Sequence, residues 1–374
     1  MKVLFSTGEV SGENYAIELK KVLEEKYEGK IDFLAIGSSR MEDHGIRIIG
    51  DISIYSTIGF TDIVKNLSSL YSLVSKLKKS IAKERPDVVI FIDSPALNLR
   101  LIPQVKKIGA KSVYLFPPQV WAWGKKRLKT LKLLNKVIVS LPFEEEFYKK
   151  NNINTTFLGH PLVDIVKVDE NYVNQIKEKY GKNTRLIGTF PGSRLSEIRN
   201  HLPILGKTLE SISNKFSDIV YLIASPSAEF SHLLEDELRY YNFPYEIIYN
   251  HPYEVMQSSE FVLTSSGTAT LEAAILGVPE IIFYRMNFIN WLFAKFLVKV
   301  DYIGLPNLIY GKLIIPELVQ WDFNPYSLEY LMIKFIVDPK VVERMSAKLL
   351  NIKGMLGEGG VLERIGDDLL SIMI

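Results

Sequence analysis

The stretch Val-Leu-Thr-Ser-Ser-Gly-Thr-Ala-Thr-Leu-Glu, residues 262–272, joins a buried strand to a helix. Its apolar start leads into small hydroxyl residues, Gly267 permits close backbone approach, and helix-forming residues follow at once. Short apolar runs alternate with helical patterns in the same way along the rest of the chain. This alternation predicts βαβ units built around parallel sheets.

The expected strands form two series. They cover residues 2–6, 31–36, 88–92, 112–116, 136–141 and 156–158, then 186–190, 219–224, 246–249, 261–265 and 280–284. The pattern relaxes at 161–171, and two amphipathic helices, split near 354–360, end the chain. We therefore predict an α/β protein with two Rossmann-like, doubly wound domains facing a cleft, residues 1–164 and 165–340, followed by C-terminal helices in 341–374.

Composition excludes several classes of protein. The 374 residues suit two domains of roughly 150–200 residues each. The absence of cysteine excludes disulfides, thiolate nucleophiles and cysteine metal sites. Because no apolar run is long enough for a signal peptide or a membrane span, we expect a cytoplasmic protein.

Positive charge is concentrated in one segment, although the net charge is only +2. Residues 94–143 contain no acidic residue. Their basic residues are Arg100, Lys106, Lys107, Lys111, Lys125, Lys126, Arg127, Lys129, Lys132 and Lys136. Such an excess indicates an anionic partner, which could be lipid headgroups, a phosphorylated substrate or nucleic acid, or else a solvated basic face.

Two glycine-containing turns are candidate anion sites. After the strand at 261–265, the unpaired N–H groups of the following helix favour an anion near residues 266–268, and Glu272 lies within reach of ribose hydroxyls. After the strand at 186–190, Arg194 could grip a diphosphate and stabilise it as a leaving group. The alternatives are an ordinary helix cap and a surface ion pair between Arg194 and Glu197.

The first half of the chain has its own polar turns. Asp93 ends a strongly apolar strand, where partial burial would raise its pKa and suit a general base, although a turn cap is the alternative. The loop from Ser6 to Glu13 contains glycines, but it lacks the pattern of a dinucleotide site or a P-loop. Its two acids favour a hydroxyl-bearing ligand such as an acceptor sugar, with Glu9, Ser11 and Gly12 as candidate contacts.

No metal site or cofactor is expected, because the five histidines are scattered and no Asp-x-Asp pair occurs. Two segments suit a membrane interface: the aromatic stretch 286–299, for which a buried core helix is the alternative, and the basic segment 121–132. Aromatic and basic residues also suit single-stranded nucleic acid, but no nucleic-acid-binding motif accompanies them. The candidate membrane contacts are Trp121, Trp123, Lys126, Arg127, Phe288, Trp291 and Phe293.

Taken in order, these motifs resemble the lipid-A-disaccharide synthases, inverting glycosyltransferases of the two-domain GT-B type, from about residue 3 to 320. The matching motifs are GEVSG at 8–12, IDSP at 92–95, VWAW at 120–123, LPFE at 141–144, GHP at 159–161, PGSR at 191–194, SGTA at 266–269, YRM at 284–286 and LPNL at 305–308. The resemblance implies an N-terminal acceptor-side, membrane-facing domain and a C-terminal UDP-sugar-binding domain. It also implies that the C-terminal helices pack back on the first domain or exchange within a homodimer.

The implied reaction transfers 2,3-diacylglucosamine from UDP-2,3-diacylglucosamine to the 6-hydroxyl of 2,3-diacylglucosamine 1-phosphate, at the inner face of the bacterial inner membrane. Asp93 matches the family's favoured general base. The positions expected to bind the donor are Gly192, Ser193, Arg194, Ser266, Gly267, Thr268, Glu272 and Asn307.

This chain departs from the family pattern in two acceptor-side motifs. Glu13 stands where the family usually has aspartate, and Ala96 and Leu97 replace the usual Asp-Phe before Asn98. Asp93 therefore lacks a second carboxylate nearby in sequence. Two other functions remain open from the sequence: a UDP-sugar 2-epimerase of the same fold, and a non-catalytic protein that binds nucleotide or lipid at a membrane surface.

Overall fold

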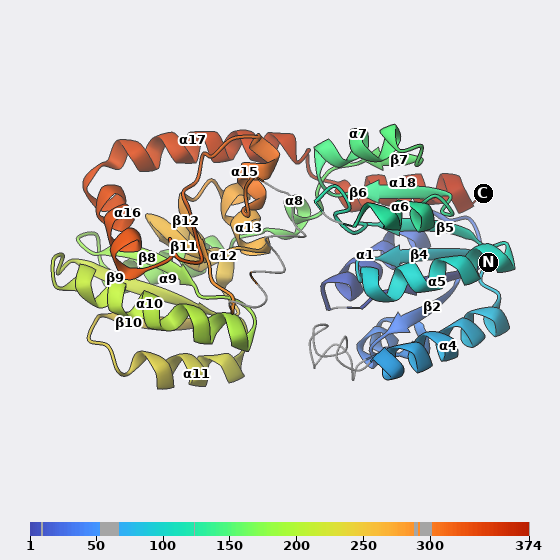
Figure 1. Ribbon diagram of the computed structural model, residues 1–374, viewed down its shortest axis with the longest axis horizontal. Coiled ribbons are helices and arrows are strands. Elements are labelled where there is room, and N and C mark those ends of the chain that lie inside the picture. Colours follow the sequence, from blue (N-terminus) through green and yellow to red (C-terminus); the bar gives the residue numbers. More distant parts are fainter. Residues whose placement is uncertain (9, 53–66, 123, 288–290, 292–300, 374) are drawn as a thin grey trace. The chain divides into compact units, whose positions relative to one another are not determined.

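The computed structural model describes residues 1–8, 10–52, 67–122, 124–287, 291 and 301–373. The chain forms two compact units, the first made of Met1–Pro161 with Gly357–Ile374 and the second of Leu162–Leu356 (Figure 1). Of the two C-terminal helices, α17 (Pro339–Met355) packs on α13 (Thr268–Leu276) of the second unit, whereas α18 (Val361–Met373) packs on α1 (Val10–Lys26) of the first. Only the last helix therefore returns to the N-terminal unit.

Within the described residues, the first unit has a seven-stranded, fully parallel sheet in the order β3-β2-β1-β4-β5-β6-β7. The strands are β1 Lys2–Ser6, β2 Asp32–Gly37, β3 Arg47–Asp51, β4 Val88–Ile92, β5 Lys111–Leu115, β6 Lys136–Val139 and β7 Thr155–Phe157. The helices are α1 Val10–Lys26, α4 Leu67–Glu84, α5 Pro95–Ile108, α6 Leu128–Leu131, α7 Pro142–Lys150 and α18, with short 3-10 turns η1 Ser39–His44 and η2 Lys125–Arg127.

Strand side chains alternate between two apolar layers. Leu4 and Phe91 face α4 and α5, while Val3 and Ile90 face α1 and α18. Burial on both faces explains why the central strands are continuous apolar runs. The sequence did not reveal β3, because this edge strand has only two apolar residues and none of its side chains is fully buried.

The second unit repeats this architecture with a six-stranded parallel sheet, in the order β10-β9-β8-β11-β12-β13 within the described chain. The strands are β8 Arg185–Phe190, β9 Ile219–Ser225, β10 Tyr245–Tyr249, β11 Phe261–Ser265, β12 Glu280–Tyr284 and β13 Glu317–Val319. The helices are α8 Leu162–Ile165, α9 Glu170–Tyr180, α10 Leu195–Ser213, α11 Ala228–Leu238, α12 Pro252–Ser258, α13 Thr268–Leu276, α15 Leu305–Tyr310, α16 Pro325–Val337 and α17. The three-residue β13 was the other strand that the sequence did not reveal.

Strand order reverses once in each sheet, between β1 and β4 in the first unit and between β8 and β11 in the second. In open parallel sheets, ligands bind outside the carboxyl ends of the strands at such a switch point. The turns after β1 and β4 contain Gly8 and Asp93, and the turns after β8 and β11 contain Arg194 and Gly267. The candidate residues of each unit therefore lie where its sheet offers a binding site.

Candidate functional site

The turn after β4 is strained. Asp93 and Ser94 both have left-handed backbone conformations, with φ angles of 47° and 46°. Each such non-glycine residue costs about 1–3 kcal/mol and persists only where the surroundings enforce it. Ser94 is buried and Asp93 is half-buried. Strain of this kind concentrates at functional sites, which supports the selection of Asp93.

The turn after β1 packs against the turn after β4. A Cβ atom on Gly8 would lie 1.8 Å from Ser94 Oγ, so only glycine fits there without moving Ser94. Gly12, a predicted acceptor contact, lies in α1 and packs near Thr7 and Ile92. Glu9 and the side chain of Ser11 lie outside the described residues.

Glu13 has a structural position in α1. It is buried, and its carboxylate accepts hydrogen bonds from the backbone N–H of Ser38 at 2.7 Å and from the Ser38 hydroxyl at 2.8 Å. The longer side chain that distinguishes this chain from the family pattern thus reaches the turn after β2.

The turn after β8 is organised around Glu197. Its carboxylate accepts the backbone N–H of Ser193 at 3.1 Å, the Arg194 guanidinium at 2.9 Å and the Tyr284 hydroxyl at 3.3 Å. Gly192, with φ 129°, leaves room for this carboxylate, because a Cβ there would lie 2.8 Å from Glu197 Oε2. The Arg194 side chain remains 71% exposed, so part of its guanidinium is open to a ligand. The surface ion pair considered from the sequence therefore exists, but it holds Arg194 at the strand end.

Sequence reasoning overlooked His201, which is fully buried beneath this turn. Its Nδ1 lies 2.6 Å from the Pro191 carbonyl, and its Nε2 accepts the Arg285 N–H at 3.0 Å. These contacts assign the proton to Nδ1. Burial is the main cause that lowers the pKa of His201, so the ring is neutral and joins the turn after β8 to the end of β12. Because His201 links two segments that lie far apart in sequence, no local pattern reveals this structural role.

The turn after β11 leads directly into α13. Gly267 and Thr268 are exposed at the helix start, and the half-buried Ser266 donates its hydroxyl to the Ile303 carbonyl at 3.0 Å. No described atom would lie within 4 Å of a Cβ on Gly267, which leaves open space beside the first helical N–H groups. The buried Ser265 hydroxyl has no hydrogen-bond partner within the described residues. An anion can therefore approach this helix end.

Glu272 and Asn307 differ in what they can contact. Glu272 is half-buried, receives the Tyr253 hydroxyl at 3.4 Å, and burial raises its pKa to about 7. Asn307 is fully buried, and its side chain bonds the backbone of Ile314 and Ile315 and the Glu317 carboxylate. A buried, fully hydrogen-bonded amide has no group left for a nucleotide. Asn307 therefore holds the segment from Ile314 to Glu317 in place and does not make the direct donor contact expected from the sequence.

The candidate membrane contacts are unequally exposed. Trp121 is half-buried, donates its indole N–H to Glu144 at 2.8 Å and packs edge-on against Phe143. Lys126 is exposed, whereas Arg127 and Trp291 are half-buried. Trp123, Phe288 and Phe293 lie outside the described residues. Among the helices that the structure describes, none combines the length and apolarity needed to cross a bilayer.

The described residues contain no group of three or more acidic or histidine side chains placed to hold a metal ion.

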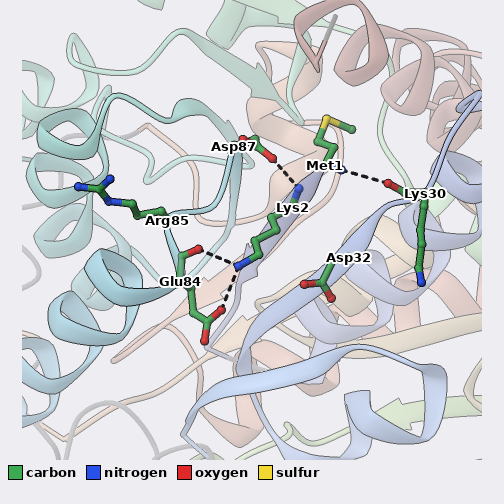
Figure 2. A pocket seen from close by; sticks show the side chains of 7 residues that line it. All are labelled: Met1, Lys2, Lys30, Asp32, Glu84, Arg85 and Asp87. Carbon is green, nitrogen blue, oxygen red and sulfur yellow. Dashed lines mark hydrogen bonds and ion pairs between the residues drawn. The ribbon is translucent and has the colours of Figure 1, made fainter.

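A hollow of about 560 Å³ opens at the amino-terminal end of the strands of the first sheet, opposite the turns described above. It is lined by Met1, Lys2, Glu84 and Asp87 among others (Figure 2). Its charged groups bond one another: Lys2 Nζ lies 3.1 Å from the Glu84 carbonyl, and the Lys2 N–H donates to Asp87 at 2.6 Å. Because it lies at the amino ends of β1 and β4, we interpret it as a structural ion network.

Comparison with solved structures shows the fold. The chain superposes on a UDP-bound MnaA from S. aureus with a TM-score of 0.67 at 16% identity, covering 99% of this chain and 97% of that one. It matches Acinetobacter baumannii MurG with a TM-score of 0.62 at 10% identity, with 99% of both chains covered. These similarities establish the two-domain GT-B architecture.

Comparison with known sequences shows the family. Residues 3–347 match the family described as lipid-A-disaccharide synthetase. The lipid-A-disaccharide synthase of Persephonella marina is 35% identical over 390 residues, covering 98% of this chain and 97% of the relative. That of a Sulfurihydrogenibium species is 34% identical over 387 residues, covering 97% and 96%. This chain therefore belongs to the lipid-A-disaccharide synthase family of glycosyltransferases.

Proposed function

We propose that the protein transfers 2,3-diacylglucosamine from UDP-2,3-diacylglucosamine to the 6-hydroxyl of 2,3-diacylglucosamine 1-phosphate, giving the β-1,6-linked lipid A disaccharide 1-phosphate and UDP. Family membership over nearly the whole chain supports this reaction. The observation that carries it is that each unit has a polar turn at its switch point, with an acid at Asp93 in the first unit and an open glycine turn before a helix at Gly267 in the second. A UDP-sugar 2-epimerase would need no lipid acceptor, and relatives of that activity share only the fold.

In the proposed mechanism, Asp93 accepts the proton of the acceptor 6-hydroxyl while the oxygen of that hydroxyl attacks C1 of the donor sugar. The bond from C1 to the UDP oxygen breaks, with inversion at C1. Charge that develops on the departing diphosphate is stabilised by the N–H groups at the start of α13 and by the exposed edge of Arg194. Glu272 binds the ribose hydroxyls, and Glu197 keeps Arg194 at the end of β8.

We further propose that the protein works as a peripheral protein at an anionic membrane surface, on the inner face of the inner membrane. Support comes from the acid-free stretch at residues 94–143, most of whose lysines are exposed in the first unit. The exposed residues are Lys106, Lys107, Lys111, Lys125, Lys126, Lys129 and Lys132. Lys136 is different, because it pairs with Asp368 of α18. Binding to anionic vesicles that weakens as salt rises would support this surface, and equal binding to neutral vesicles would contradict it.

Mass spectrometry of the product formed from acylated donor and acceptor in mixed micelles tests the reaction directly. We expect the disaccharide 1-phosphate, UDP release in equal amount, and loss of both in Asp93→Ala. Conversion of unacylated UDP-N-acetylglucosamine to its 2-epimer would identify an epimerase instead. Tight UDP binding without turnover would identify a binding protein.

A further inference from the structure

The carbonyl oxygen of Asp93 receives hydrogen bonds from two buried side chains. The Tyr114 hydroxyl, from β5, lies 2.6 Å away, and Asn98 Nδ2, from α5, lies 2.8 Å away. Neither Tyr114 nor Asn98 is exposed at all. A third bond runs from the Asp93 N–H to Leu115 O at 3.1 Å. Together the three bonds tie Asp93 to β5 and to α5.

These contacts coincide with the strained turn at Asp93 and Ser94. Asn98 also links the turn to β1, because its Oδ1 accepts the Ser6 hydroxyl at 2.6 Å and its Nδ2 lies 3.1 Å from Ser6 O. Gly8, which also follows β1, packs against Ser94. Left-handed conformations in two successive non-glycine residues persist only where such contacts over-determine them.

The Tyr114 hydroxyl is a permanent donor. Burial is the main cause that raises the pKa of Tyr114 well above its ordinary value, and the nearby charge of Asp93 raises it further. The hydroxyl therefore stays protonated at neutral pH and cannot itself act as a base there. Its role must be exerted through the bond that it donates.

We infer that Tyr114 and Asn98 are positioning residues for Asp93, fixing through its carbonyl oxygen the left-handed turn that carries the carboxylate. The inference rests on the proposed role of Asp93 as the general base. Small displacements of a reacting group cost large factors in rate, so a turn held from β1, β5 and α5 keeps the base within reach of the acceptor hydroxyl.

Tyr114→Phe tests this inference, because it removes the hydroxyl and keeps the packed ring. The matched control is Tyr221→Phe in the second unit. Tyr221 is equally buried and also donates to a main-chain carbonyl, that of Leu209 at 3.3 Å, but it lies in β9, which does not border the switch point of its sheet. Melting temperature, UDP affinity, and kcat and KM for both substrates are measured for each variant.

We expect Tyr114→Phe to lower kcat by roughly tenfold or more while KM and the UDP Kd stay within about twofold, and Tyr221→Phe to leave all three near wild type. In an Asp93→Ala background, Tyr114→Phe should leave the small residual rate unchanged, since it acts through Asp93. Full kcat in Tyr114→Phe, with activity lost in Asp93→Ala, would overturn the positioning role and leave the proposed function standing. Full turnover in Asp93→Ala would overturn the base and the positioning role together.

Discussion

The Glu197 carboxylate bonds the Arg194 guanidinium at 2.9 Å and the backbone N–H of the preceding residue, Ser193, at 3.1 Å. A buried acid thus holds a mostly exposed arginine at the end of β8. The arrangement reconciles the two roles that the sequence left open, because an arginine anchored at one nitrogen can still offer its other N–H groups to a diphosphate.

Arg194→Ala should weaken UDP binding by roughly 10- to 100-fold, which corresponds to the loss of charge-assisted hydrogen bonds worth about 1.5–3 kcal/mol. Glu197→Gln should weaken it only a few-fold, since glutamine still accepts the Ser193 N–H but holds Arg194 less firmly. Isothermal titration calorimetry with UDP measures both. Arg239→Ala is the control, because Arg239 forms a similar pair with Asp236 on an exposed surface. Unchanged UDP affinity in Arg194→Ala would contradict the donor site.

The two turn glycines should respond differently to alanine. At Gly192, φ is 129° and the new Cβ would lie 2.7 Å from Glu197 Cβ, so Gly192→Ala should destabilise the fold by about 1–3 kcal/mol. At Gly267 the backbone is extended, with φ 162°, and no described atom would lie within 4 Å of the Cβ. Gly267→Ala should therefore change stability by no more than about 0.5 kcal/mol, yet weaken UDP binding if the diphosphate sits there. Urea denaturation measures the stability of each variant, and UDP titration measures its binding. Equal losses of stability in Gly192→Ala and Gly267→Ala would contradict the difference expected between the two turns.

Glu280 should make stability fall as pH rises. It is fully buried, Oε2 accepts the Thr264 hydroxyl, and Oε1 has no partner within the described chain. Burial is the main cause that raises the pKa of Glu280 well above 4.5, so the folded state holds a proton that the unfolded state releases. The contribution of Glu280 to the free energy of unfolding is full below pH 4.5 and decreases above it with the slope of one proton released by the unfolded state.

Denaturation of wild type and Glu280→Gln between pH 4.5 and 8 checks this slope. The difference in unfolding free energy between the two proteins should shift steadily in favour of Glu280→Gln as pH rises. Glu144 and Glu272, whose pKa values are raised to about 7, titrate in both proteins and cancel in the difference. A pH-independent difference would show that Glu280 is ionised in the folded protein.

The ion pairs of Glu84 with Lys2 and Arg47, at the amino-terminal end of the first sheet, should stabilise the fold above mildly acidic pH. Hydrogen bonds from Arg47 are the main cause that lowers the pKa of Glu84 from 4.5 to about 2. Its contribution is therefore present above pH 4.5 and lost as pH falls towards 2. Glu84→Gln should cost about 0.5–1 kcal/mol at neutral pH, with the difference from wild type vanishing in acid. Glu146→Gln, which removes an exposed pair with Lys150, should have no measurable effect, and a similar loss there would point to general charge effects.

Local patterns predicted most of the fold. The central strands are buried on both faces, so they appear as apolar runs, and every expected strand is present within a few residues of its predicted ends. The expected strand at 136–141 ends earlier, at Val139, because Leu141 already caps α7. The edge strands β3 and β13 were not predicted, since a short, partly exposed strand has too few apolar residues to form a recognisable apolar run.

The sequence by itself determined the parallel α/β architecture and the chemistry of the turns, because burial and helix starts leave a signature in neighbouring residues. Only the tertiary structure decided which side chains meet. Tyr114 reaches Asp93 across a strand pair, Asn98 reaches Ser6 from 92 positions away, and Asn307 turns inward to bond the backbone. Such contacts depend on strand order and register, which bring distant segments together and which no local periodicity encodes.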